Sequence, residues 1–323
     1  MNRKAYFLAI ASISLLILIL SACSIVGDTP EEPADNTLTI AVLPILDALP
    51  LYVAEEEGLF SEQGVNVEFI PVASAPERDQ IILAEQADGM INETLSTILF
   101  NKDDTQIQIV RIARSATNEA PVFHILAAGS SGITTVEELK GVEIGISDGT
   151  IIEYLTDRLL QAEGFSSEEI GKISVPKIPD RLALLNSGEL EAAMLPDPAS
   201  FVAIGNGAVN VLDDSSHPEY GYSTIAFRKA VLDSQPEAVR AFLAAVEKAV
   251  ELINENPGRW NKLLSEKQIV PDPVSGSYQI NPYPTGGVPT ELQYQDALLW
   301  VQGKGLIDND VPYARSINPA YLP

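Results

Sequence analysis

Residues 142–165 read VEIGISDGTIIEYLTDRLLQAEGF and contain the two kinds of segment from which much of the chain is built. The apolar, β-branched run at its start predicts a strand, and the spacing of leucine and isoleucine after it predicts an amphipathic helix. The same order recurs nearer the N-terminus, with strands predicted at 37–44 and 65–72 and helices at 50–60 and 75–86. Because strands that alternate with helices form mainly parallel sheets flanked by helices, the sequence predicts an α/β fold.

The remaining segments extend this pattern and then change it. Further strands are predicted at 88–94, 106–113 and 121–128. The C-terminal third instead predicts a long amphipathic helix within 234–260 that ends before Pro257, a loop rich in Pro and Gly at 270–288, and a helix at 291–305.

Two helix starts carry the sequence pattern of a capping box, in which the side chains of the first and fourth residues bond each other's backbone N–H groups. The pairs are Thr134 with Glu137 and Ser234 with Glu237. We therefore expect helices to begin at these two positions.

One stretch of the chain echoes another. Residues 77–94 and 179–198 both have an acidic residue followed by arginine at the start of a leucine- or isoleucine-rich helix. Each then turns at small and acidic residues and ends in a short apolar strand with polar residues at its end. Any two helix–turn–strand units share some of these features by chance. The echo nevertheless suggests two lobes that are built alike.

The N-terminus has the pattern of an export signal. Asn2-Arg3-Lys4 precedes an apolar run at 5–20, which is shorter than the roughly 20 residues of a membrane-spanning helix. The following Leu20-Ser21-Ala22-Cys23 resembles the lipobox of bacterial lipoproteins, which implies removal of residues 1–22 and lipidation of Cys23. The alternative is an uncleaved anchor that happens to end at a cysteine. Residues 23–36, rich in Pro, Asp and Glu, are then expected to form a disordered tether.

Composition limits the partners and the chemistry. The 323 residues leave room for two domains, and their formal net charge of −25 disfavours nucleic acid as a partner. Cys23 is the only cysteine, so a lipidated chain can form no disulfide. His124 and His217 are the only histidines, which leaves few ligands for a transition metal. We expect neither a metal nor a cofactor.

Five segments in a fixed order resemble the substrate-binding proteins of ABC importers, in the branch that binds nitrate, sulfonates, taurine and thiamine precursors. They are LYVAEEEGLFSEQGVNVEF, AEQADGMI, GITTVEELKGVEIGISDGT, LLNSGELEAAMLPDP and PEAVRAFLAAVEKAVELINENP. The resemblance covers about residues 37–320 and implies a type II periplasmic-binding fold.

The resemblance also implies two lobes and a set of partners. The first lobe would comprise 37–125 plus 225–323 and the second 126–224, with crossover strands at 121–128 and 221–227. The partners would be a small-molecule solute, the permease and ATPase subunits of the importer, and the membrane through the lipid anchor. The protein would be a monomer on the extracytoplasmic face of the membrane.

Candidate ligand-binding residues follow from the position of the loops. Ligands of doubly wound lobes lie outside the carboxyl ends of the strands, where helix N-termini also offer free N–H groups. Polar residues in the loops after the strands and at the crossovers are therefore the candidates: Asp47, Ser74, Arg78, Asn92, Glu93, Thr94 and Asn118 from the first predicted lobe, and Ser147, Thr150, Tyr154, Asp197 and Tyr222 from the second.

Each candidate has a structural alternative. Arg78 has Glu77 and Asp79 beside it for an ion pair, and Ser147 and Thr150 are also favoured as plain helix caps. The alternatives for the rest include a solvated loop position for Asp47 and Glu93, a core position for Tyr154 and hinge packing for Tyr222. His124 is not a candidate, because a structural role is favoured for it.

The sequence favours a nitrogen heterocycle, of thiamine-precursor or flavin type, as the solute. Asp47 and Glu93 accept hydrogen bonds, and Tyr154 and Tyr222 would suit a flat ring. Arg78 and the helix N-termini favour the alternative, a sulfonate- or nitrate-type anion. We expect no enzyme activity, because the pyrimidine synthase that shares the implied fold uses a cysteine-rich motif and a histidine that this chain does not match. A third hypothesis for the function, besides solute delivery and catalysis, is a sensory lipoprotein.

Overall fold

The structure is a computed structural model that describes residues 36–323. The predicted signal peptide (1–22), the lipidation site Cys23 and nearly all of the predicted tether (23–36) lie outside the described residues. In the part that is described, no helix is both long and apolar enough to cross a membrane.

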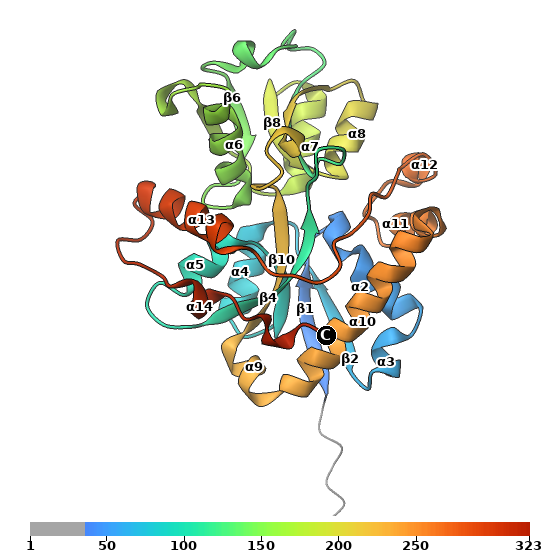
Figure 1. The fold of residues 1–323 in the computed structure, drawn as a ribbon. Helices are drawn as coiled ribbons and strands as arrows, with labels where there is room; N and C mark the ends of the chain where they lie inside the picture. Colours follow the sequence, from blue (N-terminus) through green and yellow to red (C-terminus); the bar gives the residue numbers. More distant parts are fainter. Residues whose placement is uncertain (1–35) are drawn as a thin grey trace, which may run out of the picture. The chain divides into compact units, whose positions relative to one another are not determined.

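The first of two five-stranded sheets has the strand order β2-β1-β3-β10-β4. β1 is parallel to β2 and β3, and β10 is antiparallel to both β3 and β4. Its strands are β1 (Thr37–Val42), β2 (Asn66–Pro71), β3 (Gly89–Asn92), β4 (Ile107–Ser115) and β10 (Tyr222–Arg228). Figure 1 shows these strands in the lower half of the view.

The second sheet has the order β7-β6-β8-β5-β9 and repeats the same plan. β6 is parallel to β7 and β8, and β5 is antiparallel to both β8 and β9. Its strands are β5 (Phe123–Ala127), β6 (Glu143–Ile146), β7 (Gly171–Ser174), β8 (Ala192–Pro196) and β9 (Val209–Asp213). In each sheet four strands run the same way and one runs against them, which confirms the predicted two-lobe α/β fold.

The chain passes between the sheets twice, at 116–122 and at 214–221. Both passages lie a few residues before the lobe boundaries predicted from the sequence, which fall inside β5 and β10. All of β5 pairs within the second sheet and all of β10 within the first. Figure 1 shows β10 running down from the upper lobe toward α9 at the bottom of the view.

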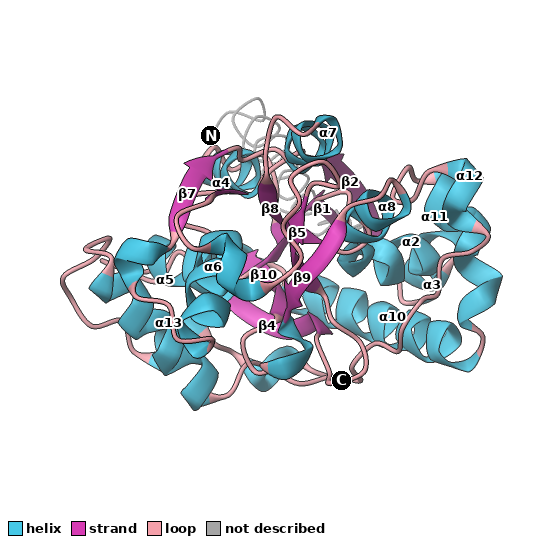
Figure 2. Cartoon of the chain, turned by 90° about the horizontal axis from the view of Figure 1, so that it is seen from above, coloured by secondary structure: helices cyan, strands magenta, loops and turns pink. Residues whose placement is uncertain are grey.

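Helices flank both sheets. Figure 2 shows the strands at the centre, with α13, α5 and α6 on one side and α10, α2 and α3 on the other. The helices are α2 (Leu49–Glu56), α3 (Leu59–Glu62), α4 (Ala75–Leu83), α5 (Thr94–Phe100), α6 (Ile151–Ala162), α7 (Ile178–Ser187), α8 (Ala199–Gly205), α9 (Lys229–Ser234), α10 (Pro236–Glu255), α11 (Asn261–Glu266), α12 (Asp272–Ser275), α13 (Glu291–Gly303) and α14 (Tyr313–Ser316). Short 3₁₀ turns complete the chain at Leu46–Ala48, Val136–Leu139, Ser167–Glu169, Asp214–Ser216, Pro257–Trp260 and Pro319–Tyr321.

The long C-terminal helix α10 holds the first lobe together. Its apolar face is buried. The ring of Phe242 in α10 stacks on the ring of Phe60 in α3, with their centroids 5.4 Å apart. Such pairs contribute about 0.5–1.5 kcal/mol beyond the area they bury. The predicted end before Pro257 is confirmed, because α10 ends at Glu255.

Both predicted capping boxes are wrong in detail. At the first, the box is formed one residue later, by Thr135 and Glu138, whose carboxylate accepts from the N–H groups of Thr134 and Thr135. At the second, Ser234 ends α9 and its hydroxyl donates to the Ala230 carbonyl. Helix α10 starts at Pro236, a residue that has no N–H to cap at the first turn.

Candidate ligand-binding cleft between the two sheets

A cavity of about 60 Å³ lies where the carboxyl ends of strands from both sheets meet. Seven of the twelve predicted ligand-binding residues line it: Asp47, Arg78, Asn92, Glu93, Ser147, Thr150 and Tyr222. They come from segments that are far apart in the sequence, and all seven are buried. The cavity is therefore built from the loop positions that the fold predicts for a ligand.

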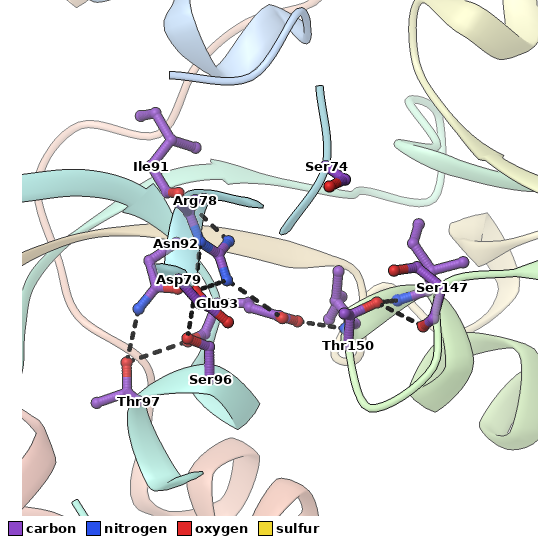
Figure 3. A network of polar contacts seen from close by, with 12 residues as sticks. Ser74, Arg78, Asp79, Ile91, Asn92, Glu93, Ser96, Thr97, Ser147 and Thr150 are labelled. Carbon is purple, nitrogen blue, oxygen red and sulfur yellow. Dashed lines mark hydrogen bonds and ion pairs between the residues drawn. The ribbon is translucent and has the colours of Figure 1, made fainter. Parts of the chain in front are cut away.

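Arg78 and Glu93 form the polar wall of the first lobe (Figure 3). The Arg78 side chain donates from Nε to Asp79 Oδ1 at 2.8 Å and from Nη1 to the Ile91 carbonyl at 3.4 Å. Its Nη2 lies 3.7 Å from Glu93 Oε1. The predicted ion pair with Asp79 is thus present, and the charge of Arg78 is matched by carboxylates of its own lobe.

Glu93 reaches across the cleft to the second lobe. Its Oε2 accepts a hydrogen bond from the backbone N–H of Ile151, the first residue of α6. Figure 3 shows this side chain pointing from the end of β3 toward Thr150. Burial raises the pKa of Glu93 to about 7, against the opposing effects of Arg78 and of the Ile151 N–H. The carboxylate therefore occupies the helix N-terminus that could otherwise bind an anion.

Asn92 and Asp47 add two more acceptors to the first lobe. Asn92 donates from Nδ2 to Thr97 Oγ1 at 2.9 Å, while its Oδ1 has no hydrogen-bond partner among residues 36–323. Asp47 accepts from the Ser223 hydroxyl, and burial raises its pKa although Arg114 and Ser223 oppose the shift. The solvated alternative for Asp47 is wrong, since the side chain is buried.

The second lobe contributes the turn before α6. Thr150 caps this helix: its Oγ1 accepts from the Ile152 N–H at 3.2 Å and donates to the Ser147 carbonyl at 2.8 Å. The Ser147 hydroxyl is buried and has no hydrogen-bond partner in the described part of the chain. The cap explains Thr150 structurally, whereas no contact within residues 36–323 accounts for the Ser147 hydroxyl.

The five other predicted residues do not line the cavity. Two of them contact residues or helices that do line it. Ser74 caps α4 by accepting from the Glu77 N–H at 3.3 Å. The Thr94 hydroxyl lies 3.0 Å from the hydroxyl of Tyr222, which does line the cavity.

The remaining three are held by contacts of their own. Asn118 is exposed and donates to the Ser215 carbonyl at 2.9 Å. Tyr154 is a core residue that packs edge-to-face on Trp300, with centroids 5.8 Å apart. Asp197 forms an ion pair with Arg114, with 2.9 Å between Oδ2 and Nη2.

Comparison with known proteins identifies the family of this chain. Residues 46–259, well over half of the sequence, match the family described as NMT1/THI5 like. The chain belongs to the NMT1/THI5-like family. Over 285 residues it is 24% identical to the formylaminopyrimidine-binding protein of Halalkalibacterium halodurans, a match that spans 80% of this chain and 78% of that protein.

Solved structures place the NMT1/THI5-like chain in the predicted fold. The alkanesulfonate-binding protein of Xanthomonas axonopodis pv. citri, bound to MOPS, superposes with a TM-score of 0.73 at 16% identity, over 88% of this chain and 98% of that one. The periplasmic nitrate-binding protein of Synechocystis PCC 6803 gives a TM-score of 0.67 at 16% identity, over 89% and 87%. The resemblance to importer binding proteins is thus confirmed for family and fold.

One charged residue of this family member's cleft is absent from the sequence predictions. Arg181, on the first turn of α7, lines the cavity and is fully buried. It donates from Nε to the Met194 carbonyl at 2.8 Å and from Nη1 to the Val175 carbonyl at 2.7 Å. The echo between 77–94 and 179–198 could have found it, because it aligns Arg181 with Arg78.

Proposed function

We propose that the chain is a solute-binding protein that delivers a small amino-substituted nitrogen heterocycle, of thiamine-precursor type, to an ABC importer. The supporting observation is the row of buried acceptors on the first lobe: the Glu93 and Asp47 carboxylates and the unpartnered Asn92 Oδ1. A ring amino group or a protonated ring nitrogen donates hydrogen bonds to such acceptors. The formylaminopyrimidine-binding relative supports the same ligand class.

Two features weigh against the alternative, a sulfonate- or nitrate-type anion. Glu93 already places a carboxylate on the N-terminus of α6, and Arg78 is neutralised by Asp79 and Glu93. The small cavity also favours a single ring over a flavin.

The delivery mechanism that we propose is closure of two lobes over the solute. The sheet plan supports lobes that meet at 116–122 and 214–221, close to the division predicted from the sequence. A solute that contacts loops of both lobes stabilises the closed state by its differential affinity. We further propose that the protein is a lipid-anchored monomer at the extracytoplasmic face, with the importer's permease and ATPase as partners, and that it binds its solute without converting it.

Calorimetric titration of the purified chain with matched ligands tests the ligand class. We expect a 4-aminopyrimidine to bind at least about tenfold more tightly than its 4-methyl analogue, because a hydrogen bond to a charged acceptor contributes about 1.5–3 kcal/mol. Recovery of the unchanged pyrimidine after incubation would agree with binding without turnover. Tighter binding of an alkanesulfonate or of nitrate would instead support the anion alternative.

Ser147→Ala should change the affinity for the pyrimidine and leave the stability of the chain nearly unchanged. We expect the free energy of unfolding to stay within about 0.5 kcal/mol of wild type, because the Ser147 hydroxyl has no partner to lose among residues 36–323. Pyrimidine affinity should fall about fivefold, the typical effect of one lost hydrogen bond. The matched control is Ser316→Ala, which removes a buried hydroxyl bonded to Asn101 and Tyr294 outside the cleft. That variant should lose stability and keep its affinity; the opposite pattern for the pair would contradict the assigned cleft.

A further inference from the structure

Each lobe contains a helix arginine that donates a hydrogen bond to a backbone carbonyl of a neighbouring strand. Arg78 on α4 donates to the carbonyl of Ile91 in β3, and Arg181 on α7 donates to the carbonyl of Met194 in β8. Each bond joins residues 13 positions apart, and β3 and β8 occupy the same place in their sheets. Both arginines line the cleft, so the echo seen in the sequence is an internal structural repeat.

The repeat differs at the positions that carry the counter-charges. In the first lobe Asp79 follows Arg78 directly, and Glu93 lies two residues after Ile91. Both acids lie within 4 Å of the Arg78 guanidinium. The matching positions of the second lobe are Leu182 and Pro196. Arg181 thus sits in the same framework without the acids that neutralise Arg78.

Arg181 is the exception among buried arginines of residues 36–323. The other three, Arg78, Arg111 and Arg114, are each paired with a carboxylate. Arg181 is bonded only to backbone carbonyls, and its Nη2 has no hydrogen-bond partner in the same range. Burial alone lowers its pKa to about 10. A buried charge without a counter-charge is costly, which favours a role in binding an electron-rich group.

We infer that the solute presents an oxygen acceptor to Arg181, so that the cleft binds a dipolar molecule in one orientation. This inference rests on the proposed function. The amino end of the heterocycle faces Glu93, Asp47 and Asn92 of the first lobe. A carbonyl or carboxylate substituent on the opposite side of the ring faces Arg181, with the Ser147 hydroxyl beside it on the second lobe. Acceptors on one lobe and donors on the other make the solute itself the bridge between them.

Three pyrimidines that share one 4-amino ring test the inference. One carries a methyl group at ring position 5, the second a formylaminomethyl group and the third a carboxymethyl group. Titrations of the purified full chain should show the methyl compound binding about 10- to 100-fold more weakly than at least one of the two oxygen-bearing compounds. Comparison of the latter two identifies carbonyl or carboxylate as the preferred acceptor. This ligand comparison on the unaltered protein needs no variant to fold.

The variant Arg181→Gln tests whether this side chain causes the preference for the oxygen-bearing pyrimidines. The variant should bind all three compounds with nearly the affinity that the wild-type chain has for the methyl compound. Arg111→Gln is the matched control, since Arg111 is equally buried, is paired with Glu247 and does not line the cavity. It should lower the melting temperature and leave the preference intact.

The outcomes separate this inference from the proposed function. Equal binding of the three compounds by wild type, a preference that survives in Arg181→Gln, or its loss in Arg111→Gln as well would overturn the inference and leave pyrimidine binding standing. Failure of all three compounds to bind would overturn the pyrimidine proposal and, with it, the inference.

Discussion

Glu93→Gln should weaken pyrimidine binding at pH 8 by about 3- to 10-fold, because a hydrogen bond to a charged acceptor contributes about 1.5–3 kcal/mol, roughly twice as much as one to a neutral acceptor. The same substitution should stabilise the ligand-free chain. Glu93 is buried and its pKa is raised to about 7, so the ionised form is disfavoured in the folded state. A glutamine of the same shape keeps an oxygen for the Ile151 N–H and removes the buried charge. Function and stability therefore oppose each other at this residue.

The pH dependence of stability follows from the direction of the pKa shift. An unfolded glutamate has its ordinary pKa of 4.5, and Glu93 in the folded chain titrates near 7. The folded state binds the proton more tightly, so the contribution of Glu93 is fully present below pH 4.5 and is lost as the pH rises to about 7. At pH 8 the variant should exceed wild type in free energy of unfolding by up to about 3 kcal/mol. At pH 4.5 the two should differ little.

Ligand binding should have the reverse pH dependence. If the ionised Glu93 is the acceptor, wild-type affinity falls below pH 7 by up to about tenfold per pH unit, whereas the variant lacks this dependence. Chemical denaturation and calorimetry from pH 5 to 8 measure both quantities. Asp214, also buried with a pKa raised to about 7, affects wild type and variant alike and cancels in their difference. A variant that binds as tightly as wild type would remove Glu93 from the binding site.

Residues that follow strands were predictable from the sequence because the fold fixes where such loops meet. Glu93 follows β3 of the first sheet and Ser147 follows β6 of the second, so both lie at the carboxyl ends of their strands, where the cavity is. Arg181 obeys the same rule only in the register of the internal repeat, since it lies on the first turn of α7 and reaches its cavity from there. The absence of a carboxylate beside Arg181 depends on the three-dimensional structure and cannot be predicted from a local sequence pattern.

Contacts between distant segments were not predictable from local patterns. Tyr278 lies in the segment expected to be a Pro/Gly-rich loop, yet its hydroxyl donates to Asp197 in the second lobe. Tyr154 has the helical spacing of either a core or a cleft residue, and only its partners Trp300 and Asp296 decide for the core. Pairings over such sequence separations depend on how the sheets pack.

Arg114→Met should be the most destabilising single substitution that we consider. Arg114 is the last residue but one of β4 in the first sheet. Its Nη2 donates to Asp197, just after β8 of the second sheet, at 2.9 Å. Both side chains are buried, and Tyr278 donates to the same carboxylate oxygen. Removal of one partner leaves an uncompensated buried charge, so we expect the free energy of unfolding to fall by about 3–5 kcal/mol in chemical denaturation at pH 7.

The double variant Arg114→Met/Asp197→Asn distinguishes a charge effect from a packing effect. If the cost comes from the orphaned carboxylate, neutralising Asp197 should restore most of the lost stability, because replacing both partners of a buried pair is often nearly neutral. Lys248→Met is the exposed counterpart: it breaks the ion pair with Glu62, whose side chain is 57% exposed, and should cost no more than about 1 kcal/mol. A double variant as unstable as Arg114→Met would show that packing of the guanidinium, including its contact with the Tyr283 ring, and not its charge, joins the two sheets.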